Sequence, residues 1–187
     1  PRHPVDRWVM FRRCRAWLEH HGYSRELSAD SLRDFQQAGA AGCWQFRVSF
    51  GDAGHVEVEL SLAMRPNENA VELVFQRRPA ALVKNPLPDS LPVSLVLRPD
   101  LEDRNFHEDT RAYAGPEKAW PAAVQPAAGG FVFAPHPERR LHVRAAPGAF
   151  HAEVEWQYMV HHPVEAERGL RAHTDLFSPG YFRAPLA

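Results

Sequence analysis

The sequence is poor in cysteine, with Cys14 and Cys43 as the only two among 187 residues. Two cysteines are too few for a disulfide framework, and they do not belong to the paired Cys and His motifs of a zinc finger. We therefore expect two reduced thiols in a cytoplasmic protein. A disulfide between them is the alternative, because a sequence gives no distance between two side chains.

The chain also lacks long apolar runs and a strong charge of either sign. No stretch approaches the roughly 18 apolar residues of a membrane helix, and no signal peptide opens the chain, so we expect no membrane partner. The net charge is −1 with His neutral, and no long basic tract stands out, which disfavours nucleic acid as a partner. The sequence begins with Pro1 rather than Met, and we expect a fragment of a larger protein.

The composition is that of an ordinary globular domain. Hydrophobic residues make up 44% of the chain and charged residues 24%. A single domain of 187 residues is large enough to bury about 70% of the surface that its unfolded chain exposes, so it needs no disulfide or metal for stability. The 17 prolines suit loops better than helix interiors.

Apolar and polar residues alternate along most of the chain after residue 38. Residues 44–50 and 56–62 alternate on either side of a Gly/Asp turn, a pattern that predicts an antiparallel hairpin. A slip of one residue would expose all the apolar side chains of a strand, so the register should be firm. The same alternation predicts strands at 71–75, 93–97, 131–133, 141–143 and 150–160. We predict an all-β fold, mainly an antiparallel β-sandwich, as a single domain over residues 39–187.

The first 38 residues show a different pattern, which predicts a helical extension packed on the sandwich. Apolar residues recur at spacings of three and four between Asp6, a suitable N-cap, and Gly22, a suitable stop. These apolar residues are Trp8, Phe11, Cys14, Trp17 and Leu18. Residues 24–37 fit either a short helix or an irregular edge strand.

The densest group of charged residues lies at 98–109, directly after the strand predicted at 93–97. We interpret it as a loop in which Glu102 or Asp103 pairs with Arg98 or Arg104 and orders the backbone. Contact with a ligand is a second interpretation, because loops often carry binding residues. Acid–base catalysis by its carboxylates and histidine is a third.

The eleven histidines do not show the spacing of a metal site. His151 and Glu153 share one face of the strand predicted at 150–160, but such a face is usually the solvated side of a sheet. The chain has neither a glycine-rich phosphate loop nor a G-x-S-x-G nucleophile motif. We expect no metal and no cofactor.

Three aromatic residues are candidates for stacking on sugar rings: Tyr113, Trp120 and Tyr181. The flat face of an aromatic ring packs well against the C–H face of a sugar. A place in the core or a chance exposed position is the alternative for each of them.

Six segments occur in a characteristic order. They are 64–75 (MRPNENAVELVF), 95–99 (LVLRP), 103–107 (DRNFH), 156–158 (WQY), 163–170 (PVEAERGL) and 175–182 (DLFSPGYF). Together they resemble the N-terminal domain of bacterial and archaeal glycogen debranching enzymes, the amylo-α-1,6-glucosidase family. Each segment is weak alone, whereas the ordered set is specific. Two features depart from the family pattern: Asp103 precedes Arg104 where the family often has the reverse order, and the opening at 6–22 has no counterpart.

The resemblance implies a function for the whole enzyme and a smaller role for this chain. In the family, the β-sandwich precedes a helical (α/α) barrel that carries the acid and base of a glycoside hydrolase, which acts on the α-1,6 branches in glycogen catabolism. The chain itself is then inactive, and the barrel of the same polypeptide is its partner. α-Glucan (glycogen or maltooligosaccharides) is a further candidate partner. Glu165 and Glu167, two residues apart beside a strand end, take a structural or interface role rather than that of a catalytic pair.

The resemblance and the charged stretch together give a set of candidate residues for glucan binding or for the interface with the barrel. They are Arg98, Asp103, Arg104, His107, Trp120, Glu165, Arg168 and Tyr181. No catalytic residue is expected among them. The alternative is a free-standing β-sandwich module that binds carbohydrate or another protein.

Overall fold

The computed structural model describes residues 7–186, which form two compact units. Unit 1 contains the residues up to Arg15 together with Leu97–Arg183. Unit 2 contains Ala16–Val96 and the residues from Ala184 onward. Three long strands contribute residues to both units, and the division at residue 38 that the sequence predicts stays a prediction.

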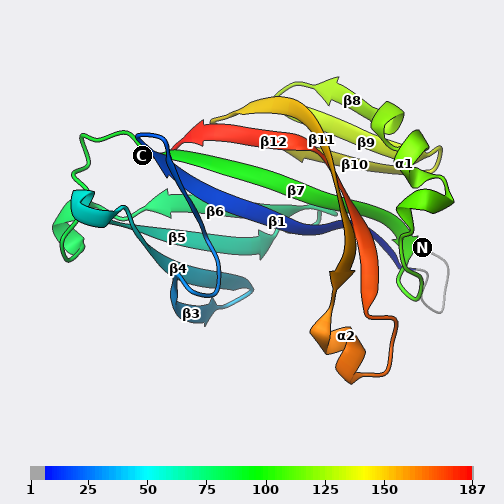
Figure 1. Ribbon diagram of the computed structural model, residues 1–187, viewed down its shortest axis with the longest axis horizontal. Helices are drawn as coiled ribbons and strands as arrows, with labels where there is room; N and C mark the ends of the chain where they lie inside the picture. The colour runs from blue at the N-terminus through cyan, green and yellow to red at the C-terminus, as the bar shows by residue number, and fades with distance from the viewer. Residues whose placement is uncertain (1–6, 187) are drawn as a thin grey trace. The chain divides into compact units, whose positions relative to one another are not determined.

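The described residues are mainly antiparallel β-structure in three sheets (Figure 1). The five-stranded sheet has the order β11 (Ala149–His161), β12 (His173–Pro185), β7 (Ser94–Asn105), β1 (Trp8–His20) and β2 (Tyr23–Glu26). The three-stranded sheet has the order β10 (Arg139–Arg144), β9 (Gly130–His136) and β8 (Val124–Ala127). The four-stranded sheet has the order β3 (Leu32–Ala38), β4 (Ala41–Ser49), β5 (His55–Met64) and β6 (Val71–Arg77). The helices are short: α1 (Pro116–Ala119), α2 (Pro163–Glu167) and the 3-10 turns η1 (Gly51–Ala53), η2 (Ala80–Leu82), η3 (Ala112–Ala114) and η4 (Pro121–Ala123).

The predicted all-β fold is confirmed, and the predicted hairpin forms in unit 2 from β4 and β5. Phe46 pairs with Val58, and Val48 pairs with Val56. All four side chains are buried. Each contributes about 1.5–3 kcal/mol when it leaves water, and this gain holds the register of β4 on β5.

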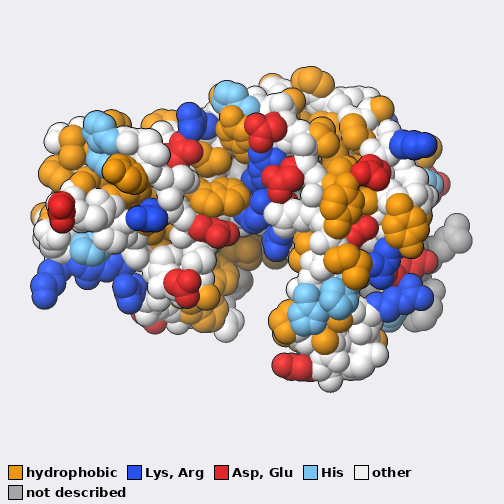
Figure 2. Space-filling model, viewed as in Figure 1, with side chains coloured by type: hydrophobic (Ala, Val, Ile, Leu, Met, Phe, Trp, Pro, Cys, Tyr) orange, Lys and Arg blue, Asp and Glu red, His pale blue; other side chains and the backbone are white. Residues whose placement is uncertain are grey.

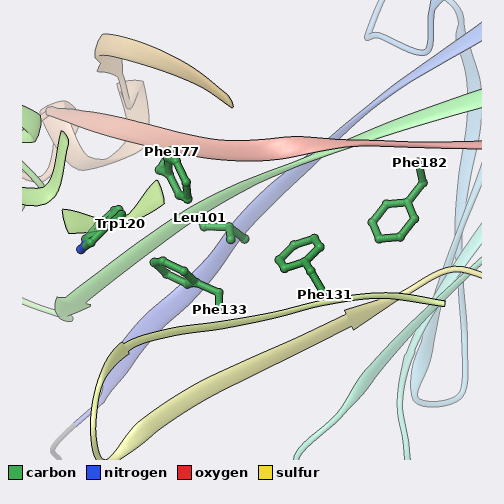
Figure 3. Packing of buried hydrophobic residues seen from close by; sticks show 6 residues of the cluster. All are labelled: Leu101, Trp120, Phe131, Phe133, Phe177 and Phe182. Carbon is green, nitrogen blue, oxygen red and sulfur yellow. The ribbon is translucent and has the colours of Figure 1, made fainter. Parts of the chain in front are cut away.

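The core of unit 1 is an aromatic cluster that lies between strands of two sheets (Figure 3). Its buried members are Leu101 of β7, Phe131 and Phe133 of β9, Phe177 and Phe182 of β12, and Trp120. The rings of Phe133 and Phe177 approach to 5.7 Å between centroids, across the space between β9 and β12. Side chains from two facing sheets thus meet in one core, which is the packing of a β-sandwich.

The predicted N-terminal helix is wrong, because residues 8–20 form strand β1. Ala16, Leu18 and His20 are buried at alternate positions, as a strand requires. The face that carries Arg13 is mixed, because its arginines meet a carboxylate on β7 and stand among apolar residues such as Phe11 and Trp17. A mixture of apolar and charged positions therefore obscured the period of two. The proposed N-cap, Asp6, lies outside the described residues.

The charged stretch is not a loop at its start, because β7 continues to Asn105. Arg98, Asp100 and Glu102 are buried on this strand. Their burial depends on partners from other strands, which a sequence does not show. Of the two alternatives for residues 24–37, the structure has the strand, as β2 and β3.

Strand β12 was not predicted, because its Ser-Pro-Gly sequence is typical of a turn. In the structure Pro179 and Gly180 lie inside this strand. The register between β11 and β12 shifts between the pairs Ala152↔Gly180 and Glu155↔Ser178, so Pro179 sits opposite a bulge. A bulge is a position where proline, which has no N–H to donate, is tolerated in a sheet.

Candidate functional site

All eight candidate residues from the sequence lie in unit 1. The structure brings two of them together, since the Arg98 guanidinium lies over the Tyr181 ring at 5.5 Å from its centroid. Asp103 and Arg104 are on β7, and the other four lie in turns after that strand or in and beside α2.

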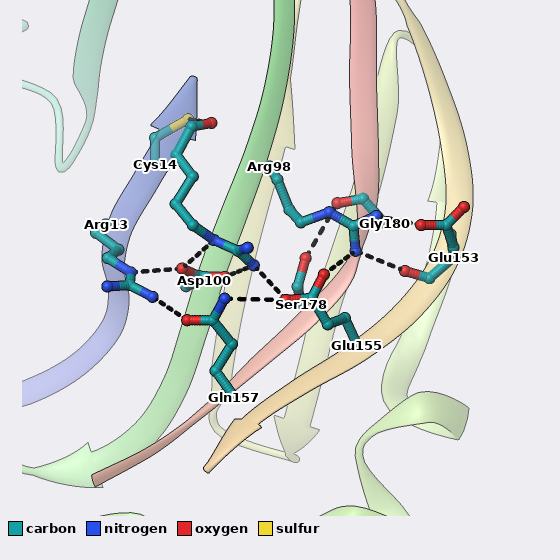
Figure 4. Close-up of polar contacts among 10 residues, drawn as sticks. Arg13, Cys14, Arg98, Asp100, Glu153, Glu155, Gln157, Ser178 and Gly180 are labelled. Atoms are coloured by element: carbon teal, nitrogen blue, oxygen red, sulfur yellow. Dashed lines mark hydrogen bonds and ion pairs between the residues drawn. The ribbon is translucent and has the colours of Figure 1, made fainter. Parts of the chain in front are cut away.

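The strongest polar feature of unit 1 is a network of charged side chains on β1, β7 and β11 (Figure 4). Asp100 is at its centre and is completely buried. It accepts hydrogen bonds from Arg13 Nε at 2.6 Å and from Arg15 Nε and Nη2 at 2.9 and 2.8 Å. A buried carboxylate is tolerated only when it is paired and hydrogen-bonded in this way.

The network continues to β11 through two carboxylates. Glu155 accepts from Arg15 Nη2 at 2.9 Å and lies 3.1 Å from Arg98 Nη1. Arg98 also donates to the Glu153 backbone carbonyl at 3.1 Å and to its side-chain carboxylate. Tyr181, under the Arg98 guanidinium, stacks on the His151 ring at 5.0 Å between centroids.

These contacts keep Glu155 ionised. Burial alone would raise the pKa of Glu155, but the hydrogen bond from Gln157 and the charges of Arg15 and Arg98 outweigh it and leave the pKa lowered. A general acid in glycoside hydrolysis needs the opposite, a carboxyl group whose pKa is raised so that it holds a proton. The network therefore holds β1, β7 and β11 together, and its ionised Glu155 is unsuited to the role of a general acid.

Asp103 and Arg104 do not pair with each other. Asp103 accepts two hydrogen bonds from the Arg139 guanidinium, from Nε at 2.7 Å and from Nη2 at 2.9 Å. This ion pair connects β7 to β10. Arg104 Nε donates to Glu102 Oε1 at 2.8 Å. Its Nη1 donates to three backbone carbonyls in the turn that follows β7, of which that of Glu108 is the nearest at 2.7 Å. The interpretation in which Glu102 pairs with an arginine and orders the backbone is thus confirmed.

Glu102 is a second buried carboxylate, next to the turn that Arg104 holds. Its Oε1 accepts from the hydroxyls of Thr110 and Thr174 at 3.1 and 2.7 Å. Its Oε2 is buried and has no hydrogen-bond partner among the described residues, and the same is true of His162 Nε2. Through these two hydroxyls, Glu102 connects the end of β7 to β12 and to the segment at Thr110.

The remaining candidates occupy different environments. Trp120 is buried, so of the alternatives given for it the structure has the place in the core. His107 is exposed in the turn after β7, where its ring packs edge-on against Phe106 at 5.2 Å. Arg168 is exposed just after α2, and Glu165 is partly exposed within it.

The histidines do not gather into a metal site. Within residues 7–186, the structure contains no group of three or more His, Cys, Asp or Glu side chains that could hold a metal ion. His161 and His173 pair across β11 and β12, with ring centroids 4.9 Å apart. Cys14 and Cys43 are free thiols.

The sequence analysis missed several residues that build this site. Arg13 and Arg15 lie in the stretch that was predicted as a helix, and Asp100 lies in the stretch that was interpreted as a loop. A signal was present, since two arginines separated by one residue point to the same side of a strand. Tyr158 and Asp175 were not considered as site residues, because their positions depend on a bulge in β11 that alternation alone does not reveal.

The fold and this network define a class: an all-β domain whose charged groups fix strands to one another. Residues 1–187 match the family described as glycogen debranching enzyme N terminal. The chain therefore belongs to the family of N-terminal domains of glycogen debranching enzymes, as its motifs indicate.

Two further comparisons found no relative. No curated protein matches the chain. No solved structure matches it either. In the described part of the chain, no helix combines the length and the apolar character needed to cross a membrane.

Proposed function

We propose that this chain is the non-catalytic β domain at the N-terminal side of a cytoplasmic glycogen debranching enzyme, a glycoside hydrolase with amylo-α-1,6-glucosidase activity. It supports the catalytic (α/α) barrel of the same polypeptide and contacts α-glucan. The observation that carries this proposal is the family match over the whole chain, and it is supported by Asp100 and Asp175, whose carboxylate oxygens all accept hydrogen bonds within the domain.

The buried carboxylates support a structural role for the domain. Hydrolysis of a glycosidic bond needs one carboxyl group that holds a proton and a second that activates water or attacks the sugar. Asp100 and Asp103 are each held by arginine, and Asp175 accepts two backbone N–H bonds at 2.8 Å. Groups held in this way stabilise strands and are poorly placed to exchange protons with a substrate.

The surface near α2 is suited to contact with another domain. Val164 and Leu170 are 54% and 53% exposed there, on either side of the candidate residues Glu165 and Arg168. Interfaces between domains of one chain combine apolar and polar side chains in this manner. We therefore place the support of the barrel at the segment 163–170.

The isolated chain should release no glucose from glycogen or from limit dextrin. The measurement is glucose release over hours at high protein concentration, with a complete debranching enzyme as the positive control. Turnover that disappears when a single carboxylate, such as Glu165, is changed to its amide would contradict the proposal.

Contact with glucan is tested separately by affinity electrophoresis. The chain is run in native gels with and without glycogen, next to an inert protein as reference. Retardation by glycogen supports direct contact, whereas unchanged mobility would restrict the proposal to support of the barrel.

A further inference from the structure

Three aromatic side chains of unit 1 form a ladder that leads from the core to the surface. Trp120, in the core, stacks on Trp156 of β11 with ring centroids 5.5 Å apart and planes at 25°. Trp156 in turn stacks on Tyr158, with centroids 6.5 Å apart and planes at 16°. The exposure rises along the ladder from 7% for Trp120 to 56% for Tyr158. The ladder therefore ends in an exposed ring whose orientation is set from the core outward.

The backbone at the end of the ladder is held in an unusual conformation. Met159, next to Tyr158, has a φ of 54°, in the left-handed region that a methionine rarely adopts. The register between β11 and β12 shifts here, between the pairs Gln157↔Leu176 and Val160↔Thr174. A bulge of this kind redirects side chains, and backbone strain of this kind is often found at functional positions.

A single buried carboxylate fixes this bulge to the segment that contains η3. Asp175 Oδ1 accepts from the Met159 N–H at 2.8 Å, and its Oδ2 accepts from the Ala112 N–H at 2.8 Å. Asp175 is 3% exposed, so both bonds are protected from water. The segments that carry Tyr113 and Tyr158 are thus anchored to the same group.

A second carboxylate fixes the outer ring itself. The Tyr158 hydroxyl donates to Glu117 Oε1 of α1 at 2.5 Å. Glu117 is exposed, so its other oxygen is available to further hydroxyl donors. Tyr113, which lies four residues before Glu117 in the sequence, is 82% exposed. Figure 2 shows hydrophobic side chains gathered along the course that Figure 1 gives to β11, with acidic side chains beside them.

We propose that Tyr158 and Glu117 form a surface site for a glucose residue of an α-glucan chain. The inference rests on the proposed contact with glucan and names its place. A sugar offers a C–H face that packs on an aromatic ring and hydroxyls that donate to a carboxylate, and this surface presents both partners side by side. The ring needs no ordering upon binding, because the ladder and Glu117 already hold it. None of the eight candidate residues from the sequence carries this site, although Trp120 supports it from the core.

The test compares variants of the whole 187-residue chain in affinity electrophoresis with glycogen and in titration with maltoheptaose. Tyr158→Ala should raise the dissociation constant about tenfold or more, because it removes the stacking surface. Tyr158→Phe keeps the ring and should change the constant by less than about threefold. Tyr23→Ala removes another exposed tyrosine, on β2, and should bind like the parent chain. Circular dichroism and thermal unfolding confirm that each variant is folded.

The outcomes separate this site from the broader proposal. Loss of retardation in Tyr158→Ala alone, with Tyr23→Ala unchanged, supports the site. Equal retardation of Tyr158→Ala and the parent chain would overturn the site and leave the contact with glucan standing elsewhere on the domain. Absence of retardation in the parent chain itself would overturn both, with the support of the barrel unaffected.

Discussion

At the scale of single residues, Asp100 is the group on which most of the polar network in unit 1 depends. It is fully buried and joins two arginines of β1 to the middle of β7. Its burial is costly unless both arginines stay in place, and their own partial burial is costly unless the carboxylate stays ionised. The contributions of these three side chains to the stability of the fold therefore depend on one another.

Asp100→Asn should destabilise the chain strongly. The amide keeps the shape of the side chain but removes the counter-charge of Arg13 and leaves Arg15 paired with Glu155 alone. Removing one partner of a buried ion pair costs about 3–5 kcal/mol, and we expect a value near the lower end because Arg13 is partly exposed. The measurement is the free energy of unfolding in urea.

The matched control for Asp100 is an exposed acidic residue in an ion pair. Glu68 pairs with Arg65 at 3.5 Å, and both side chains are more than half exposed. Glu68→Gln should cost less than about 1 kcal/mol, as surface pairs do. Equal costs for the two variants would show that the Asp100 network adds no special stability.

Cys14 should be almost inert as a thiol. Its burial, together with the nearby Asp100 charge, raises the pKa of Cys14 to about 12. At pH 8 only about one thiol in ten thousand is then ionised, and only the thiolate reacts with iodoacetamide. In a Cys43→Ser variant, we expect slow alkylation of the folded chain and fast alkylation in denaturant. Similar rates in both conditions would contradict the raised pKa of Cys14 in the folded chain.

At the scale of elements, the connection between β11 and α2 contains a titratable group with several charged neighbours. His162 directly precedes α2 and donates its backbone N–H to the Ala172 carbonyl at 2.7 Å. Its burial and the positive charge of Arg12 lower the pKa of His162. The charges of Arg13 and Arg104 lower this pKa further, whereas the charge of Glu102 raises it. The folded state thus holds this imidazole in its neutral form.

Mild acid should therefore weaken the folded chain through His162. With its folded pKa below the ordinary value of about 6.5, the unfolded chain binds more protons as the pH falls through this value, and stability is lost. His162→Gln should lose less unfolding free energy between pH 7.0 and 5.5 than the parent chain. The other histidines are common to both proteins and cancel in the comparison. An identical loss in both would show that His162 does not titrate with folding.

The elements also show what a sequence can predict here. Alternation was enough for β4, β5, β9 and β11, because one face of each is apolar. It failed for β1, whose Arg13 and Arg15 share one face of the strand and bind Asp100 on another strand. A pattern of hydrophobicity cannot predict that Arg13 pairs with a buried carboxylate 87 positions further along the chain.

The same reason limited the prediction of the site. Arg98 and Tyr181 were found from motifs, and the structure does bring them together. For Trp120 the sequence left stacking on sugar and a place in the core both open, and tertiary packing puts the ring in the aromatic core. Tyr158 was taken as one position of a regular strand, and only the bulge fixed by Asp175 makes it distinctive.

At the scale of the whole molecule, charge balance dominates the behaviour in solution. The net charge is −1 with His neutral, and the isoelectric point is about 7.0. The solubility of the isolated chain should therefore be lowest near pH 7 and rise toward pH 6, since each protonated histidine adds a positive charge. Precipitation by ammonium sulfate across this range checks the prediction. Highest solubility at pH 7 would contradict it.

The order of strands in the five-stranded sheet has a consequence for synthesis of the chain. β1 leaves the ribosome well before its neighbour β7, because Asp100 follows Arg13 by 87 residues. At about 5–20 residues per second, this delay lasts about 4–17 s. For that time the first strand has β2 beside it and no β7 on its other edge. Arg13 and Arg15 lie on this strand without Asp100 during that time, and charged side chains on an edge strand disfavour its pairing with other chains.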